Sequence, residues 1–400
     1  MNHDVIVIGA GPAGCNTALQ LAREGAKVLL LDKQTFPRDK PCGGGLTPRA
    51  ASVPGLDFSP VTEQTVHGVR FSLRLKKGFE RRFDKPLTYM TQRSRLDAYL
   101  AECAAEAGAE FHDGEGVTAI DLVALPTVRT NRGTYSAEVL IGADGANGLV
   151  GRASGLRPGA KHAVALEANL PATGQLIDEW RDYIGMDLGS VAGGYGWLFP
   201  KGDHVNVGVG AWSYAGFTLR SKLARLARSF GFDPAKLENL RGYRLPVRAP
   251  GSLVADGRVA VVGDAAGLVD PLTGEGIHMA FASGSLAAES AISLLSGETA
   301  DMSCYQRAVD HDLQSELDAS ATLQELFHLA PPPYVALLRR SQKFWRFFCY
   351  LIRGDLTYPD FMRKIGPVRF AVNYFSAVAR RHRYAKVAAG ERLLAAEAFA

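Results

Sequence analysis

The sequence predicts the α/β class, with a βαβ unit at its centre, and an α+β arrangement when the whole chain is considered. Three observations lead to this prediction. Short runs of apolar and β-branched residues lead directly into glycine-rich turns, as buried parallel strands do. Helical periodicity follows the first and the last of these turns. Long intervening stretches rich in Val, Phe, Tyr and turn residues are typical of antiparallel sheet. The turns are Gly9–Gly14, Gly142–Gly145 and Gly263–Gly267, the last followed by Gly274–Gly276.

The first unit is complete within about thirty residues. Val5–Ile8 is a short apolar run bounded by glycine, which predicts a buried strand. Pro12–Arg23 has helical periodicity, and Gly25 follows its end. Lys27–Asp32 predicts the next strand. Strand, helix and strand in this order form a βαβ unit, so we expect a Rossmann-like domain here.

Similar patterns predict the remaining elements. Helices are expected at Arg95–Ala107 and Ile277–Leu295, and strands at Ser136–Gly142 and Arg258–Gly263. The tail is expected to be helical, with Pro331–Pro333 as a break. We therefore expect a discontinuous nucleotide-binding domain, an inserted antiparallel-sheet domain that binds the substrate, and a helical C-terminal region. Their ranges are 1–52, 91–160 and 246–300 for the first, 53–90 and 161–245 for the second, and 301–400 for the third.

Composition and charge restrict the class of protein. Apolar content of 47% and charged content of 22% are ordinary for a globular chain, and a net charge of +4 is too small to argue for nucleic acid. The charge is nevertheless uneven, because 339–386 holds twelve basic and two acidic residues. Basic residues beside Phe344, Trp345, Phe347 and neighbouring apolar residues suit contact with an anionic membrane.

The cysteine pattern and the lack of targeting signals predict the cellular compartment of the protein. The cysteines are scattered, without a Cys-x-x-Cys pair, which favours a reducing compartment and argues against a disulfide framework or a metal site. Neither a signal peptide nor a run of about 18 apolar residues is found, so we expect a cytoplasmic protein that does not span a bilayer. The cysteines are Cys15, Cys42, Cys103, Cys304 and Cys349.

The glycine motifs carry the first chemical prediction. In Gly-x-Gly-x-x-Gly the first glycine makes the turn, the second lets the backbone approach a pyrophosphate, and the third lets helix pack on strand. Asp32 ends the second strand, where an acid can bind a ribose hydroxyl. Asp264 can accept hydrogen bonds from a ribityl chain, and the Gly274–Gly276 turn sets backbone N–H groups near a flavin ring. Together the three motifs predict bound FAD.

Two further motifs resemble those of a known family. The glycine motifs resemble the flavoprotein group that includes para-hydroxybenzoate hydroxylase. Within that group, the geranylgeranyl reductase family is similar in two segments, Pro41–Leu46 and the pattern Tyr195-x-Trp197-x-Phe199-Pro200, which is followed after seven residues by Gly208-x-Gly210. The resemblance covers roughly residues 1–300. One departure lies in the middle motif, where Gly148 replaces the usual serine and the nearby arginine is Arg152.

The resemblance implies that reduced FAD delivers hydride to isolated C=C bonds of a prenyl chain. Such a reaction needs hydride at one carbon and a proton at the other, in a dry slot. We expect Tyr195, Trp197 and Phe199 to line that slot and stabilise positive charge, and Cys42 to relay a proton or tune the flavin. The residues expected to bind FAD are Gly9, Gly11, Pro12, Ala13, Gly14, Asp32, Lys33, Cys42, Gly43, Gly44, Arg93, Asp264, Gly274, Gly276 and Ile277.

Alternatives remain open at this point. The same chemistry could act on a menaquinone tail, since Gly45–Arg49 is similar to the corresponding segment of those enzymes. An FAD monooxygenase or halogenase shares the three glycine motifs but acts on aromatic rings with O₂. The sequence holds no second dinucleotide fingerprint, so the electron donor could be NAD(P)H or ferredoxin. The expected partners are a prenylated lipid or prenyl diphosphate and the surface of an anionic membrane.

Overall fold

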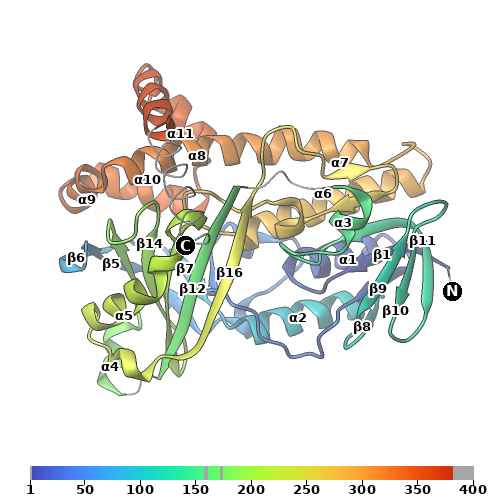
Figure 1. Ribbon diagram of the computed structural model, residues 1–400, viewed down its shortest axis with the longest axis horizontal. Helices are drawn as coiled ribbons and strands as arrows, with labels where there is room; N and C mark the ends of the chain where they lie inside the picture. The colour runs from blue at the N-terminus through green and yellow to red at the C-terminus, as the bar shows by residue number, and fades with distance from the viewer. Residues whose placement is uncertain (1, 157–160, 172–173, 382–400) are drawn as a thin grey trace, which may run out of the picture.

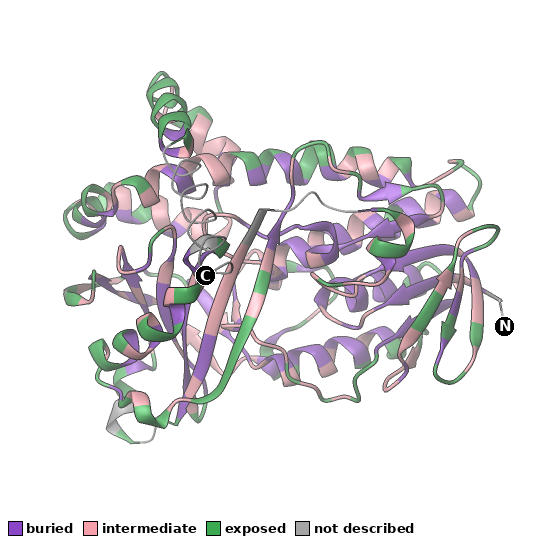
Figure 2. Cartoon of the chain, viewed as in Figure 1, coloured by how far each residue is buried: buried purple, intermediate pink, exposed green. Residues whose placement is uncertain are grey.

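The computed structural model describes residues 2–156, 161–171 and 174–381. Two large sheets lie in opposite halves of the molecule, and the C-terminal helices extend along one side of both (Figure 1). Buried residues concentrate on the inner strands and the helices packed on them (Figure 2).

The first sheet is parallel at its centre. Its strand order is β17-β18-β11-β1-β2-β8, and β1 lies between β11 and β2 with parallel pairing on both sides. A meander of β9 and β10 adds to β11 in antiparallel fashion. The strands are β1 (Asn2–Ile8), β2 (Val28–Leu31), β8 (Glu110–His112), β9 (Val117–Asp121), β10 (Thr127–Thr130), β11 (Thr134–Gly142), β17 (Ala255–Asp256) and β18 (Val259–Val261).

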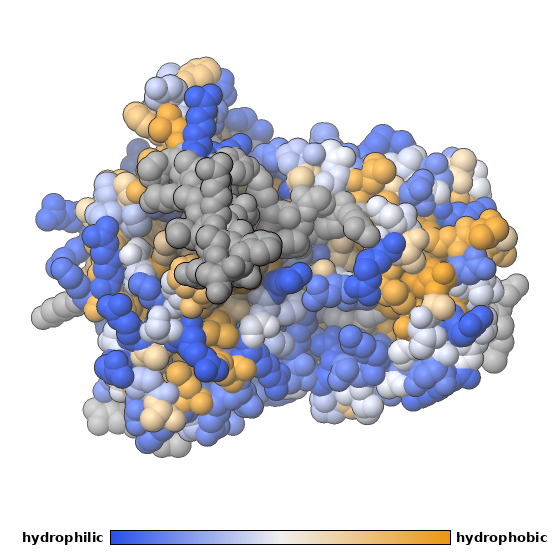
Figure 3. All heavy atoms as spheres, viewed as in Figure 1, coloured by the Kyte–Doolittle hydropathy of each residue, from blue (hydrophilic) through white to orange (hydrophobic). Residues whose placement is uncertain are grey.

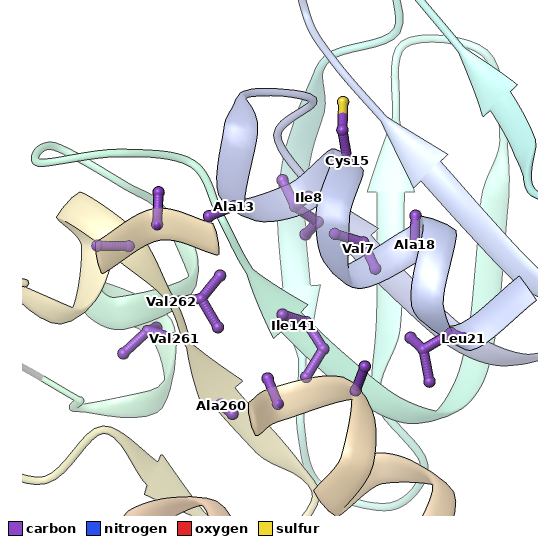
Figure 4. Close-up of a cluster of buried hydrophobic side chains, with 14 of the residues drawn as sticks. Val7, Ile8, Ala13, Cys15, Ala18, Leu21, Ile141, Ala260, Val261 and Val262 are labelled. Atoms are coloured by element: carbon purple, nitrogen blue, oxygen red, sulfur yellow. The ribbon is translucent and has the colours of Figure 1, made fainter. Parts of the chain in front are cut away.

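Three main helices pack on this sheet, namely α1 (Pro12–Arg23), α2 (Arg93–Glu106) and α6 (Ile277–Leu295). Small residues let α1 and α6 come close, since a Cβ on Gly284 would lie 2.8 Å from the Ala13 carbonyl oxygen. The Asn16 amide donates to the Phe281 carbonyl at 2.8 Å. Figure 4 shows the core between these elements, with labelled side chains from β1, α1, β11 and β18.

The second sheet has the order β16-β12-β15-β14-β13-β5-β6. Its neighbouring strands are antiparallel except β5 and β13, which pair in parallel and come from separate segments of the chain. One face packs on α5 (Leu219–Ser229). The strands are β5 (Gly68–Leu73), β6 (Lys76–Arg82), β12 (Lys161–Pro171), β13 (Tyr183–Leu188), β14 (Tyr195–Pro200), β15 (His204–Trp212) and β16 (Glu238–Val247).

Smaller elements join the two sheets. A three-stranded sheet has the order β3-β7-β4, from β3 (Gly45–Leu46), β7 (Thr88–Met90) and β4 (Gln64–Val66). The short helices are η1 (Ala50–Ser52), η2 (Ser59–Val61), α3 (Val150–Ser154), α4 (Gln175–Trp180), η3 (Ser213–Thr218), η4 (Pro234–Lys236) and η5 (Gly263–Ala266).

The C-terminal segment is helical, as expected. Its elements are α7 (Ser303–Ala308), η6 (Val309–Leu313), α8 (Gln314–Leu329), α9 (Pro331–Arg340), α10 (Gln342–Arg353) and α11 (Tyr358–Lys364), followed by helix 368–381. The expected break is confirmed, because α8 ends at Leu329 and α9 begins at Pro331. Arg383 and Lys386 of the basic tail lie outside the described residues.

The aromatic side of α10 corrects one expectation. Trp345 is fully buried and donates to the Arg82 carbonyl at 2.8 Å, and its ring meets Phe71 edge-on. Phe344 and Phe348 are half-buried against the same cluster. These aromatics therefore pack against the second sheet, so they do not form an apolar face that could enter a membrane.

Most local predictions are confirmed. The helices α1 and α6 begin and end where the sequence placed them, and α2 begins two residues earlier than expected. The sequence analysis did not predict α4, α5 or the β9–β10 meander. It missed α5 because 161–245 was assigned to antiparallel sheet, although Leu219, Leu223 and Leu226 recur with helical spacing. The domain boundaries at residues 52, 90, 160, 245 and 300 stay a prediction.

Candidate flavin and prenyl-chain site

The first glycine turn lies where β1 ends and α1 begins. Gly9 has φ +102°, and a Cβ on it would lie 2.4 Å from the Ala143 carbonyl oxygen. A Cβ on Gly14 would lie 1.8 Å from the Gly9 carbonyl oxygen. The protein's own packing therefore requires both glycines.

Gly11 differs from these two glycines. A Cβ there would meet only the guanidinium groups of Arg38 and Arg93, at 3.7 and 3.9 Å. Its backbone is extended, which any residue can adopt, and no side chain caps α1, which starts at Pro12. Open space therefore lies before a helix N-terminus and beside two cations, which is what a diphosphate group needs. This cradle fits FAD.

Asp32 lies at the end of β2, as expected. Its carboxylate accepts from the backbone N–H groups of Ala10 and Gln34, both at 2.9 Å. Arg38 lies 3.5 Å from Asp32 and 2.8 Å from the buried Asp97, while Arg93 makes a bidentate contact with Asp97 at 2.8 and 2.7 Å. Sequence reasoning missed Arg38, because no motif marks the loop after β2.

The third glycine motif gathers a second polar cluster. Asp264 accepts from Tyr243 at 2.8 Å and from Lys40 at 3.2 Å. Burial raises the pKa of Asp264, but Lys40, the Tyr243 hydroxyl and Arg93 together outweigh that effect, so the pKa is lowered and the carboxylate stays ionised. Gly274 has φ +71°, and α6 begins at Ile277 without a capping side chain. The Gly274 N–H donates to the Asp270 carbonyl and the Glu275 N–H to the Thr273 hydroxyl. The N–H groups that could face an electron-rich ring are therefore those at the start of α6.

The middle motif has a local structural role. The Asp144 carboxylate accepts from the backbone N–H groups of Leu149 and Val150 at 2.5 and 3.0 Å, at the start of α3. A Cβ on Gly148 would lie 2.0 Å from an oxygen of that carboxylate. The glycine that departs from the family pattern therefore leaves room for this contact.

The aromatic strand explains the spacing of its motif. Tyr195, Trp197 and Phe199 alternate along β14 and face one side of the sheet, with ring centroids 6.0 and 6.2 Å apart. In β15, Gly210 pairs with Tyr195 and Gly208 pairs with Trp197. A Cβ on Gly208 would lie 2.0 Å from the indole, so glycine is required where that ring lies over the neighbouring strand.

Hydrogen bonds fix the ends of these aromatics. The Trp197 Nε1 donates to Asn206 at 2.8 Å, and the Tyr195 hydroxyl donates to the Thr273 carbonyl, next to the third glycine motif. Burial raises the pKa of Tyr195, which keeps its hydroxyl protonated. The second sheet is thereby tied to the loop before α6.

The Cys42 loop lies against the same strand. A Cβ on Gly43 would lie 2.7 Å from the Phe199 ring, and the Gly44 N–H donates to the Cys42 Sγ at 3.3 Å. The Cys42 N–H donates to Glu167 of β12 at 2.7 Å. Lys201, which is 3% exposed, donates to the Gly43 and Thr91 carbonyls.

Sequence reasoning missed Glu167 and Lys201, although Lys201 directly follows Pro200 of the aromatic motif. Burial raises the pKa of Glu167 to about 6 and lowers the pKa of Lys201 to about 8. Two buried ionisable groups with shifted pKa values thus hold the loop that carries Cys42. Such shifts are typical of a functional site.

One cavity of about 540 Å³ joins these parts. It contacts the α1 and α6 N-termini, the Cys42 loop and the aromatic strand, and it continues between the second sheet and the C-terminal helices. Gly9, Gly14, Asp32 and the exposed Lys33 do not line it. The expected residues that do line it are Gly11, Pro12, Ala13, Cys42, Gly43, Gly44, Arg93, Tyr195, Trp197, Phe199, Asp264, Gly274, Gly276 and Ile277.

We expect Glu167→Gln to raise stability at neutral pH by about 2 kcal/mol. Because the pKa of Glu167 is raised to about 6 in the fold, the native protein gains stability from this group at low pH. That gain is lost as pH rises through 6, whereas glutamine keeps an acceptor for the Cys42 N–H without a buried charge. Urea midpoints at pH 4.5 and 7.5 test this.

The exposed Glu289 on α6 supplies the control, as Glu289→Gln removes a carboxyl that is not buried. An advantage of the Glu167 variant that is equal at both pH values would contradict the prediction.

Residues 2–156, 161–171 and 174–381 contain no group of three or more His, Cys, Asp or Glu side chains that could hold a metal ion. None of the helices within these same ranges combines the length and apolar composition that a membrane span requires.

The chain is similar in sequence to a family model and to proteins that are named reductases. Residues 2–174 match the family model described as FAD binding domain. The chain is 35% identical over 314 residues to menaquinone reductase of Mycobacterium tuberculosis, covering 72% of this chain and 76% of the relative. It is 33% identical over 319 residues to geranylgeranyl diphosphate reductase of Rhodobacter capsulatus, covering 76% and 78%.

Solved structures agree at the level of the fold. A geranylgeranyl bacteriochlorophyll reductase-like protein from Thermoplasma acidophilum superposes with a TM-score of 0.74 at 24% identity, covering 91% of this chain and 98% of that one. A flavin-dependent brominase superposes with a TM-score of 0.70 at 19% identity, covering 88% and 94%. Both structural likenesses show the fold alone.

Proposed function

The chain belongs to the geranylgeranyl reductase family of FAD-dependent oxidoreductases, and from this we propose that it reduces C=C bonds in a prenyl chain. The observation that carries the proposal is the continuous cavity. It brings the FAD cradle, the Cys42 loop and three aromatic rings to one end of an apolar channel. An isolated alkene has no polar group that a side chain could bind, so its reduction requires alignment in a dry channel.

The proposed reaction adds two hydrogens to each double bond. Reduced FAD, when bound, supplies the hydride. The proposed roles of Trp197 and Phe199 are to exclude water and stabilise the positive charge that develops on the second alkene carbon. Cys42 is proposed to give the proton to the other alkene carbon, so that the hydride adds to the carbon that carries the positive charge, and to recover a proton from solvent through the cavity. The proposed electron donor, NAD(P)H or ferredoxin, returns FAD to its reduced form after each double bond is reduced.

The experiment follows the mass of the product. Purified protein is incubated anaerobically with dithionite and a geranylgeranyl lipid, a menaquinone or geranylgeranyl diphosphate. We expect products heavier by two hydrogens for each bond reduced, with no need for O₂. A product that forms only when O₂ is supplied, with oxygen or halide on an aromatic ring, would support the monooxygenase or halogenase alternative instead.

A menaquinone tail is a second candidate substrate. The relative from Mycobacterium tuberculosis is named menaquinone reductase, and its identity to this chain is 35%, against 33% for the geranylgeranyl diphosphate reductase. The rates on the three substrates in the same assay rank them.

Peripheral contact with an anionic membrane, on the cytoplasmic face, is the remaining part of the proposal. Arg339 and Arg340 of α9 and Lys343 and Arg346 of α10 are exposed. Replacing all four with Glu should release the protein from anionic vesicles, because the new negative charges repel the lipid surface. FAD should stay bound, because the electrostatic effect of surface charges decays over about 8 Å at physiological salt. Sedimentation with vesicles measures this, and equal pelleting of the variant and the wild type would count against contact through these residues.

A further inference from the structure

The far end of the cavity is lined by hydrocarbon. Besides the aromatic strand, residues of α9, α10, α11 and helix 368–381 line the cavity. The lining side chains from these helices are mostly apolar, and they include Leu338, Phe344, Phe347, Phe348, Leu351, Ile352, Phe361, Ile365, Val368 and Val372.

Positive charge lies only at the cofactor end of the described lining. Its lysine and arginine side chains are Lys40, Arg93 and Arg241, and each contacts a carboxylate, namely that of Asp264, Asp97 and Asp39. A diphosphate placed beside α10 or α11 would meet no lysine or arginine among these residues. The far end is therefore suited to a hydrocarbon chain and unsuited to an anionic head group.

The cavity reaches the surface at the start of helix 368–381. Val368 lines the cavity and is also 60% exposed. The same helix exposes Phe370, Tyr374, Phe375 and Val378, so bulky apolar groups gather beside the opening. In Figure 1 the C-terminal helix, coloured red, protrudes from the body, and in Figure 3 orange and blue residues lie side by side on it. A cluster of exposed apolar side chains of this kind marks an interaction surface.

The charge around the opening indicates what that surface binds. Segment 358–381 has five basic residues and one acidic residue, Asp360, which already contacts Arg363. Lys364, Arg369 and Arg381 are exposed. Aromatic and aliphatic side chains interleaved with Arg and Lys are typical of a helix that lies in the interface of an anionic bilayer.

We propose that helix 368–381 docks on an anionic bilayer and that the substrate enters tail-first beside Val368, leaving its head group at the lipid surface. This inference rests on the proposed function, and it narrows the substrate to a membrane-resident prenyl lipid or quinone. The hydrocarbon tail then passes from one apolar phase to another without crossing water.

The test separates docking from catalysis. One variant combines Phe370→Ser, Tyr374→Ser and Phe375→Ser, which removes exposed rings only. The matched control combines Val123→Ser, Phe217→Ser and Leu253→Ser, which are exposed apolar side chains elsewhere. Each protein is sedimented with vesicles of 30% phosphatidylserine in phosphatidylcholine. Each is then assayed on a prenylated quinone embedded in those vesicles or dispersed in detergent.

We expect the helix variant to lose tenfold or more in vesicle binding and in turnover of embedded substrate. Its FAD content and its turnover in detergent should stay within twofold of the wild type, and the control variant should match the wild type throughout. Embedded turnover by the helix variant equal to that of the wild type would overturn the proposal. A dimeric wild type together with a monomeric helix variant would overturn it as well, by assigning this face to a second copy of the chain.

Two outcomes separate this inference from the proposed function. Failure of the wild type to reduce any prenyl substrate, in vesicles or in detergent, would overturn the proposed function, while sedimentation still decides docking. Faster reduction of free geranylgeranyl diphosphate without lipid than of embedded quinone would overturn tail-first entry alone.

Discussion

Gly11→Val is expected to yield a folded protein that binds no FAD. A Cβ at this position meets only two guanidinium groups, at 3.7 and 3.9 Å, and the backbone is extended, so the apoprotein tolerates the side chain. The same side chain occupies the space before α1 that a pyrophosphate needs. Flavin absorbance per protein measures the loss, and circular dichroism and the thermal midpoint of the apoprotein report the fold.

Gly14→Ala is the matched comparison for this prediction. Its Cβ would lie 1.8 Å from the Gly9 carbonyl oxygen, so the backbone must move, at a cost of about 3 kcal/mol or more. We therefore expect this variant to lose stability and FAD together. Full flavin content in Gly11→Val would mean that the pyrophosphate lies elsewhere.

Cys42→Ala is expected to slow turnover about a hundredfold while FAD binding persists, a loss within the range of general acid catalysis. The thiol is only partly buried, and its sulfur accepts from the Gly44 N–H at 3.3 Å and from the side chain of Arg93. The loop itself is held through its backbone, because the Cys42 N–H donates to Glu167 and Lys201 donates to the Gly43 carbonyl. Loss of the thiol should therefore change chemistry more than folding.

Separate half-reactions make the Cys42 test specific. Reduction of FAD by the donor should keep its wild-type rate, whereas reoxidation of the flavin by a prenyl substrate under anaerobic conditions should slow. Cys42→Ser restores an acceptor for the Gly44 N–H and controls for the loop. Equal slowing of both half-reactions, or normal turnover in Cys42→Ala, would remove Cys42 from the mechanism.

Local patterns were sufficient where neighbouring residues in the sequence decide the structure. The βαβ unit could be predicted because β1, the glycine turn and α1 are specified within the first 25 residues by apolar runs and helical periodicity. The aromatic motif could be recognised because Trp197 and Gly208 pair across adjacent strands, where an indole requires a glycine. Composition alone could not predict that the aromatic side chains of α10 are buried, because they are buried by contact with residues of β5.

The sequence by itself determined the cofactor class and the family, since each depends on short motifs whose spacing reflects contacts along one or two elements. The tertiary structure alone decided how the site is held and where the channel leads. Glu167 reaches the Cys42 loop across 125 positions in the chain and Lys201 reaches it across 158. Such contacts leave no period or spacing in the sequence, because they arise only when two sheets and a set of C-terminal helices pack around one cavity.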